Sequence, residues 1–259
     1  MLKKRLIAVL ILREGQVVQS VQFKHTNVIH YDAVHAIECF NKWAVDEIVI
    51  LNVSPDRNSR GGFANTLERI SRQCFVPISA GGWIDDSGYA EILLRSGADK
   101  LVINTAFFDN PDLALQLSRK YGSQCIVASM DVRAQSDMNG VRTVWVDRGR
   151  RNTCVEVVSW ASKVEALGAG EIFFNSISHD GARKGYDLET LKAICSKVSI
   201  PVIAFGGVFN WEHLKQGLEA GADAVAAANI FHYTEHSTYK AKKFLLDASR
   251  HGQFHIRNI

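Results

Sequence analysis

Two glycine pairs stand at positions where a turn of the chain could bind an anion. Gly81-Gly82 and Gly206-Gly207 each directly follow a short apolar run that is typical of a buried strand. Because glycine has no Cβ, such a turn lets backbone N–H groups approach a phosphate closely, and the N-terminus of a following helix adds a favourable dipole. A tight turn without a ligand explains either pair alone, but the repetition favours two phosphate sites.

Aromatic residues flank both glycine pairs, and further hydrogen-bond donors follow other apolar runs. Trp83 comes after the first pair and Phe205 precedes the second, either as core packing or as platforms on which a sugar or base stacks. The sequence therefore predicts a small phosphorylated ligand. The donors expected to support it are Asn104, Thr105, Gly181, Ala228 and Asn229.

A carboxylate that could act as a general acid or base ends another apolar run. Asp131 closes the run Ile126-Val-Ala-Ser-Met-Asp131, where such a group could transfer a proton. An Asp at a strand end can equally cap a helix or order a loop. The first run, Ala8–Leu12, ends without a carboxylate, so paired acid/base chemistry between these two strands is not supported.

Four charged residues begin apolar runs at what should be the opposite end of the fold. Arg5, Glu47, Lys100 and Glu171 supply two positive and two negative charges, and charges that are buried together must pair. One interpretation is a salt-bridged plug that stabilises the end of the fold. The other is a gate that opens for a small neutral molecule.

Three histidines and a basic cluster carry weaker predictions, and the tail carries none. His25, His30 and His35 could touch a substrate, but scattered histidines without a carboxylate pattern are more often surface residues. The basic cluster Arg148-Gly-Arg-Arg-Asn152 could meet a phosphate or an acidic partner, or form a solvated turn. The tail Ser249–Ile259 has no interpretable motif.

The elements that must position these residues are short apolar runs alternating with longer segments. Most of the connecting segments are long enough for a helix, and those at Tyr89–Gly97 and Trp211–Gly221 are amphipathic and end at a glycine. This alternation predicts an α/β fold, a single (β/α)8 TIM barrel. The eight predicted strands are Leu6–Leu12, Glu47–Asn52, Val76–Ala80, Lys100–Asn104, Cys125–Asp131, Glu171–Asn175, Val202–Phe205 and Ala224–Ala228.

The chain also resembles itself at a constant offset. Glu47-Ile-Val matches Glu171-Ile-Phe, and Gly97-Ala-Asp matches Gly221-Ala-Asp, each 124 residues apart. We therefore expect one barrel built from two half-barrels, spanning residues 1–259 as a single domain with a short tail from about residue 247. Both glycine pairs should then lie at the C-terminal face, where barrel enzymes keep their sites.

Composition limits the remaining function classes. The chain has 259 residues, of which 47% are hydrophobic, and a formal net charge of +3, which indicates a globular protein without the basic excess that binds nucleic acid. Five cysteines without a Cys-x-x-Cys pair indicate reduced thiols. The same cysteine pattern makes a zinc site unexpected, and we expect no metal and no cofactor. No apolar run is long enough to span a membrane, so we expect a cytoplasmic protein.

Several longer strings resemble the HisF family, the cyclase subunit of imidazole glycerol phosphate synthase, over residues 1 to about 246. The resemblance implies a barrel on whose bottom a HisH-like glutaminase docks, and through which ammonia passes to a phosphorylated substrate at the top. The strings are Lys4-Arg5, Ile7-Ala8, Glu14–Val18, Asp46-Glu47, Gly97–Ala106, Gly122-Ser-Gln124, Gly168–Ile172, Asp180-Gly181, Gly185–Asp187 and Phe231-His232.

The resemblance assigns roles to individual residues at the barrel bottom. The ammonia gate of the family falls on the four charges at positions 5, 47, 100 and 171, all of which are present. Asp99 and Gln124 match positions near the glutaminase contact.

The upper face departs from the family pattern. Ile11 stands where the first catalytic aspartate is expected, so Asp131 alone remains of the two. Gln19, Asn52, Trp83 and Phe205 also replace the family's Lys, Asp, Gly and Ser. An isoleucine cannot transfer a proton, and losing a positioned acid or base reduces a rate by about 10²–10⁴.

We therefore expect a HisF-like subunit that still conducts ammonia but delivers it to other chemistry. It looks like the HisF-related paralogues of surface-polysaccharide gene sets, which work with a glutaminase and a separate sugar amidotransferase to make an acetamidino group on a nucleotide-linked sugar. Two alternatives stay open. One is the ordinary cyclase of histidine biosynthesis, and the other is a non-catalytic barrel that binds and activates the glutaminase.

Overall fold

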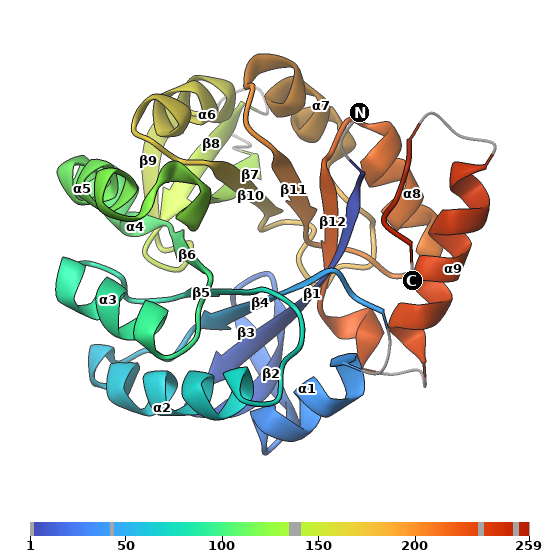
Figure 1. Ribbon diagram of the computed structural model, residues 1–259. Helices are drawn as coiled ribbons and strands as arrows, with labels where there is room; N and C mark the ends of the chain where they lie inside the picture. The colour runs from blue at the N-terminus through green and yellow to red at the C-terminus, as the bar shows by residue number, and fades with distance from the viewer. Residues whose placement is uncertain (1–2, 42–43, 135–140, 233–235, 251–253, 259) are drawn as a thin grey trace.

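The structure is a computed structural model that describes residues 3–41, 44–134, 141–232, 236–250 and 254–258. Eight parallel strands pair in chain order, and the last pairs with the first to close a barrel (Figure 1). The predicted (β/α)8 barrel is confirmed. Its strands are β1 (Arg5–Arg13), β4 (Glu47–Asn52), β5 (Ile78–Gly81), β6 (Lys100–Ile103), β7 (Ile126–Ala134), β10 (Glu171–Ser176), β11 (Val202–Phe205) and β12 (Ala224–Ala227).

Helices surround the barrel and have local reasons to begin where they do. Before α3, the side chain of Asp86 accepts a hydrogen bond from the backbone N–H of Tyr89, so this helix starts at Ser87, two residues earlier than predicted. The helices are α1 (Ala33–Asn41), α2 (Arg60–Ser71), α3 (Ser87–Arg95), α4 (Thr105–Asp109), α5 (Pro111–Tyr121), α6 (Val157–Ala166), α7 (Leu188–Lys197), α8 (Trp211–Glu219) and α9 (Ser237–Ser249). Short 3-10 turns lie at Arg57–Ser59, Ser123–Cys125 and Asn229–Phe231.

Two antiparallel extensions were not predicted. Beyond β1, strands β2 (Gln16–Val21) and β3 (His25–His30) form a hairpin, with Leu12 opposite Val17. Beyond β7, strands β8 (Arg142–Val146) and β9 (Arg151–Glu156) form a second hairpin. Both extensions continue barrel strands past their C-terminal ends, so they stand at the mouth of the barrel.

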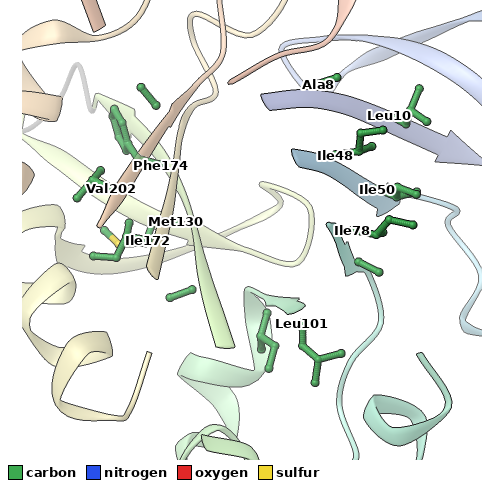
Figure 2. Packing of buried hydrophobic residues seen from close by; sticks show 14 of the residues in the cluster. Ala8, Leu10, Ile48, Ile50, Ile78, Leu101, Met130, Ile172, Phe174 and Val202 are labelled. Atoms are coloured by element: carbon green, nitrogen blue, oxygen red, sulfur yellow. The ribbon is translucent and has the colours of Figure 1, made fainter. Parts of the chain in front are cut away.

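The core has two layers because strand side chains alternate between the two faces of the sheet. Side chains such as Leu10, Ile48 and Phe174 belong to one large buried cluster (Figure 2), which also contains helix residues such as Leu67 and Leu93. Inward-facing side chains fill the barrel itself, and they include Ile7, Val9, Ile11, Val49, Val102, Val127, Phe173, Ile203 and Phe205. The interior is therefore a packed apolar core, as closed barrels of this size require.

The same contact occurs once in each half of the barrel. Asp99 accepts a hydrogen bond of 2.8 Å from the backbone N–H of Ile78, at the start of β5. Asp223, which lies 124 residues further on, accepts one of 3.1 Å from the N–H of Val202, at the start of β11. The matching strings of the sequence thus fold into matching contacts.

The C-terminal tail returns to the first strand. The backbone N–H of Lys4 donates a 2.6 Å hydrogen bond to the carbonyl oxygen of His255, and Lys4 forms a parallel bridge with Ile256. Phe254 and Ile256 are both buried. The tail therefore packs beside the residue that precedes Arg5.

Candidate functional site

The four charged residues at the strand starts form one hydrogen-bonded ring at the bottom of the barrel. Arg5 Nη1 lies 2.6 Å from Glu47 Oε1, and Arg5 also donates to Glu171. Lys100 Nζ lies 3.2 Å from Glu47 Oε1 and 3.0 Å from Glu171 Oε2. Each cation contacts both carboxylates, so the charges alternate around the ring.

Burial makes this pairing obligatory. Burial alone would lower the pKa of Arg5, but the carboxylates of Glu171 and Glu47 outweigh it and raise that pKa above its ordinary value. The Lys100 side chain is 20% exposed, against 6% for each glutamate. Lys100 is therefore the member of the ring that is most accessible from solvent.

The two residues predicted to meet a glutaminase lie on the same end of the barrel. Asp99 directly precedes Lys100 and is exposed, with one carboxylate oxygen held by the start of β5. Gln124 is exposed in the turn before β7. Both side chains therefore share the bottom face with the charged ring.

At the opposite end, Asp131 is held between two asparagines. Its Oδ2 accepts a 2.9 Å hydrogen bond from Asn104 Nδ2, and its Oδ1 accepts one of 3.2 Å from Asn175 Nδ2. Asp131 is 9% exposed, and burial, with a contribution from Asp180, raises its pKa to about 7. A carboxyl group with such a pKa can both donate and accept a proton near neutrality.

A cavity of about 850 Å³ opens above Asp131. Its walls include three of the predicted phosphate-site residues, Gly82, Asn104 and Thr105. Gly81 does not line it, because this residue lies inside β5, where an added Cβ would come within 2.4 Å of the carbonyl oxygen of Val102. The close approach of β5 to β6 accounts for Gly81.

The predicted phosphate-site residues of the second half line a separate cavity of about 170 Å³. Gly206 and Gly207 both have the positive φ angles that glycine favours. The buried Oδ1 of Asn229 has no hydrogen-bond partner among the described residues, as expected at a polar ligand site. The predicted residues that line this cavity are Gly181, Gly206, Gly207, Ala228 and Asn229.

Comparison with known proteins identifies the family of the chain. Residues 5–237 match the model of the family described as histidine biosynthesis protein. The chain belongs to this family. It is 39% identical to imidazole glycerol phosphate synthase subunit HisF of Caulobacter vibrioides, over 249 residues that cover 96% of this chain and 95% of the relative.

A second relative of the histidine biosynthesis family is a Vibrio vulnificus protein provisionally named imidazole glycerol phosphate synthase subunit hisF2. It is 41% identical over 249 residues, which cover 96% of this chain and 90% of that protein. Within the ranges that the structure describes, no helix is long and apolar enough to cross a membrane.

Ile11, which departs from the expected HisF pattern, lines the larger cavity. Ile11 is 6% exposed and lines the same cavity as Asp131, so an apolar side chain occupies the place expected for the second acid. The other carboxylates that line this cavity are Asp85, Asp109 and Asp147, and each is paired with an arginine. Asp131 is thus the candidate acid or base of this mouth.

The two aromatic departures occupy different positions. Phe205 lines both cavities and packs on Phe173, with 5.0 Å between ring centroids, so it forms part of the wall between them. Trp83 donates from Nε1 to the carbonyl oxygen of Ser54 at 2.9 Å, and the guanidinium of Arg148 lies over its ring. One face of Trp83 is therefore already covered.

Two of the predicted histidines gather away from both cavities. The rings of His30 and His232 are 5.3 Å apart, and those of His30 and His35 are 6.5 Å apart. Burial, with a contribution from His30, lowers the pKa of His232 to about 4. His25 is exposed at the start of β3, and the described residues contain no group of side chains suited to a metal ion.

Sequence reasoning missed several polar residues of the mouth. Asn175 pairs with Asp131 in the register of β10 and β7, which an asparagine near a strand end could have indicated. Arg13, Lys24 and Arg133 also line the larger cavity. They lie on or beside the two hairpins, whose positions could not be inferred from the apolar pattern.

Proposed function

We propose that this chain is a HisF-like barrel subunit that receives ammonia from a glutaminase and releases it into the larger cavity. The observation that carries the proposal is the contrast between the two ends of the barrel. The four-charge ring at the bottom is complete, whereas the mouth holds Asp131 without a second catalytic carboxylate, because position 11 is isoleucine.

The ring suits a gate for a neutral molecule. Lys100 is its most exposed member, and withdrawal of its ammonium group toward solvent would leave Arg5 to hold both glutamates. Beyond the ring, the barrel is lined by apolar side chains such as Val9, Val49 and Ile203. Neutral ammonia enters such surroundings at far lower cost than the ammonium ion.

The partner in this proposal is a HisH-like glutaminase on the bottom face. Asp99 and Gln124 are exposed there, on the same end as the ring. The curated relatives carry the word subunit in their names, which is consistent with a barrel that works in a complex.

The acceptor in this proposal is a nucleotide-linked sugar whose acetamido group a separate sugar amidotransferase converts into an acetamidino group, in surface-polysaccharide synthesis. Resemblance to paralogues with that role, together with Ile11, supports the assignment. The barrel would act in the cytoplasm, where such precursors are made, and Asp131 would relay a proton if the mouth takes part.

A second candidate is the cyclase reaction of histidine biosynthesis. Asp131 favours it, since its pKa of about 7 suits acid/base catalysis, as does the 39% identity to HisF. A third candidate, a barrel that only activates the glutaminase, has the same bottom face but needs no passage for ammonia.

The gate is tested by Lys100→Ala in the complex reconstituted with the glutaminase, the amidotransferase and glutamine. We expect the variant to form less product per glutamine hydrolysed, because ammonia escapes or is blocked at the ring. Lys215→Ala is the matched control, since Lys215 forms ion pairs on the outer helix α8. Unchanged coupling in Lys100→Ala would count against a gate and favour the activating scaffold.

A further inference from the structure

The two hairpins meet over the mouth of the barrel. Gly149 lies in the turn between β8 and β9, and an added Cβ on it would come within 2.9 Å of Cδ2 of Phe23, in the turn between β2 and β3. The backbone N–H of Asp147 donates to Thr105 Oγ1 at 3.0 Å, which fixes the second turn to the barrel. The turns therefore form a common roof over the larger cavity.

This roof brings several cations to the cavity wall without carboxylate partners. Arg13 donates to Thr26 Oγ1 at 2.8 Å, and the guanidinium of Arg133 lies 4.5 Å from the centre of the Trp145 ring. Lys24 and Arg150 are exposed in the two turns. Among the described residues, none of these four cations forms a salt bridge.

The carboxylates of the same wall do not compensate this charge. Asp85 pairs with Arg60, Asp109 pairs with Arg151, and Asp131 is bound by asparagine amides. Asp147 lies 3.5 Å from Arg148. In addition, the buried Nε of Arg148 has no hydrogen-bond partner among the described residues. The cavity therefore carries an excess of positive charge.

Below the cations, the floor of the cavity is apolar. It includes Ile11, Leu51, Val102, Phe173 and Phe205. The cavity of about 850 Å³ is five times as large as the second one, at about 170 Å³, and its size is typical of sites for organic ligands. A single phosphate would neither fill the cavity nor match the charge of four cations.

We propose that the larger cavity binds a ligand that carries a diphosphate group, through Lys24 and Arg150 in the turns of the two hairpins and through Arg13 and Arg133 at the ends of β1 and β7. The organic part of the ligand lies on the apolar floor, near Asp131. Cations on both hairpins contact the diphosphate oxygens, since guanidinium groups bind phosphates with paired hydrogen bonds. This proposal rests on the proposed function. It adds the chemical class of the molecule that the larger cavity binds, at the place where ammonia would leave the barrel.

Binding is measured by titration calorimetry on the whole chain without glutaminase, using inorganic pyrophosphate, orthophosphate and uridine diphosphate in turn. We expect pyrophosphate to bind at least tenfold more tightly than orthophosphate. We expect uridine diphosphate to bind more tightly still, because its nucleoside contacts the floor. Equal affinities for pyrophosphate and orthophosphate, or no binding of either diphosphate at millimolar concentration, would overturn the proposal.

Variants locate the site. Arg13→Gln and Arg150→Gln should each weaken pyrophosphate binding about tenfold, since each removes one charged contact. Two controls should bind as the unmodified chain does: Arg95→Gln, on the outer helix α3, and Arg72→Gln, at the end of the outer helix α2, since both arginines form exposed ion pairs outside the two cavities. Circular dichroism checks that all variants fold. If the cavity variants bind like the controls, the diphosphate site lies elsewhere and the proposal fails.

These measurements are separable from the test of the proposed function. Pyrophosphate binding needs no glutaminase and no ammonia, so a failed Lys100→Ala experiment leaves its outcome unaffected. Conversely, Lys100→Ala could lower the product formed per glutamine hydrolysed while no diphosphate binds. That result would support the passage of ammonia and would overturn the diphosphate site.

Discussion

Asn175 pairs with Asp131 across neighbouring barrel strands and donates a 3.2 Å hydrogen bond from Nδ2 to its Oδ1. An amide stabilises the ionised carboxylate less than a cation would, so burial dominates and the pKa of Asp131 rises to about 7. The raised pKa of Asp131 is thus a consequence of its burial among the neutral neighbours that the fold gives it.

The raised pKa of Asp131 predicts a pH dependence of stability. Because the folded-state pKa, about 7, exceeds the ordinary value of 3.8, the native state holds a proton that the unfolded state has lost between these values. The stability that Asp131 contributes is therefore fully present below about pH 4 and is lost as the pH rises to about 7.

The Asp131→Asn variant isolates this contribution. We expect the free energy of unfolding of the unmodified chain to fall relative to the variant between pH 4 and 7, with a slope approaching about 1.4 kcal/mol per pH unit. Urea denaturation at a series of pH values measures the difference. Parallel profiles for the two proteins would show that Asp131 titrates normally.

The charged ring predicts a large effect of removing one member. In Arg5→Ala, Lys100 alone would face the two buried glutamates, and losing a partner of a buried ion pair costs about 3–5 kcal/mol. Arg72→Ala is the control, because Arg72 forms an exposed pair with Glu68 and its loss should cost less than about 1 kcal/mol. Urea denaturation of both variants checks the contrast, and similar losses would argue against a tightly coupled ring.

The contact between the hairpin turns predicts unequal effects at two glycines. Gly149 and Gly15 have similar positive φ angles, 71° and 80°, but only an added Cβ at Gly149 would meet another side chain within 3 Å. Gly15→Ala should therefore cost about 1 kcal/mol for backbone strain alone. Gly149→Ala should cost more and make the β2–β3 turn more accessible to a protease. Equal stability and equal cleavage would contradict the contact.

The barrel itself could be predicted from the sequence because its strands are buried on both faces. Continuous β-branched runs such as Glu171–Asn175 therefore stand out from the chain. The predicted strand Val76–Ala80 begins later, at Ile78, since the segment before it ends in Pro77, which has no N–H for a strand ladder. The 124-residue offset between matching strings also predicted that both glycine pairs lie at the C-terminal face of the barrel.

The mouth could be predicted only in part. Asp131 follows from its place at the end of an apolar run, and Ile11 follows from the resemblance to the HisF family, but neither predicts the hairpins. Strand β3, for example, is mostly exposed and reads His25-Thr-Asn-Val-Ile-His30, without an apolar pattern. The cations of the roof came together through these unpredicted strands. The place of the tail was missed because its contacts with Lys4 join residues about 250 positions apart in the sequence, which no local pattern indicates.

The central claim is that this HisF-like barrel handles ammonia without efficient cyclase chemistry, because Ile11 replaces an acid. The most direct test is turnover of the ribulosyl substrate of histidine biosynthesis by the purified chain with its glutaminase, supplied with glutamine or ammonium. We predict turnover about 10²–10⁴-fold below an ordinary cyclase, partly restored by Ile11→Asp. Turnover of the unmodified chain at an ordinary cyclase rate would contradict the account.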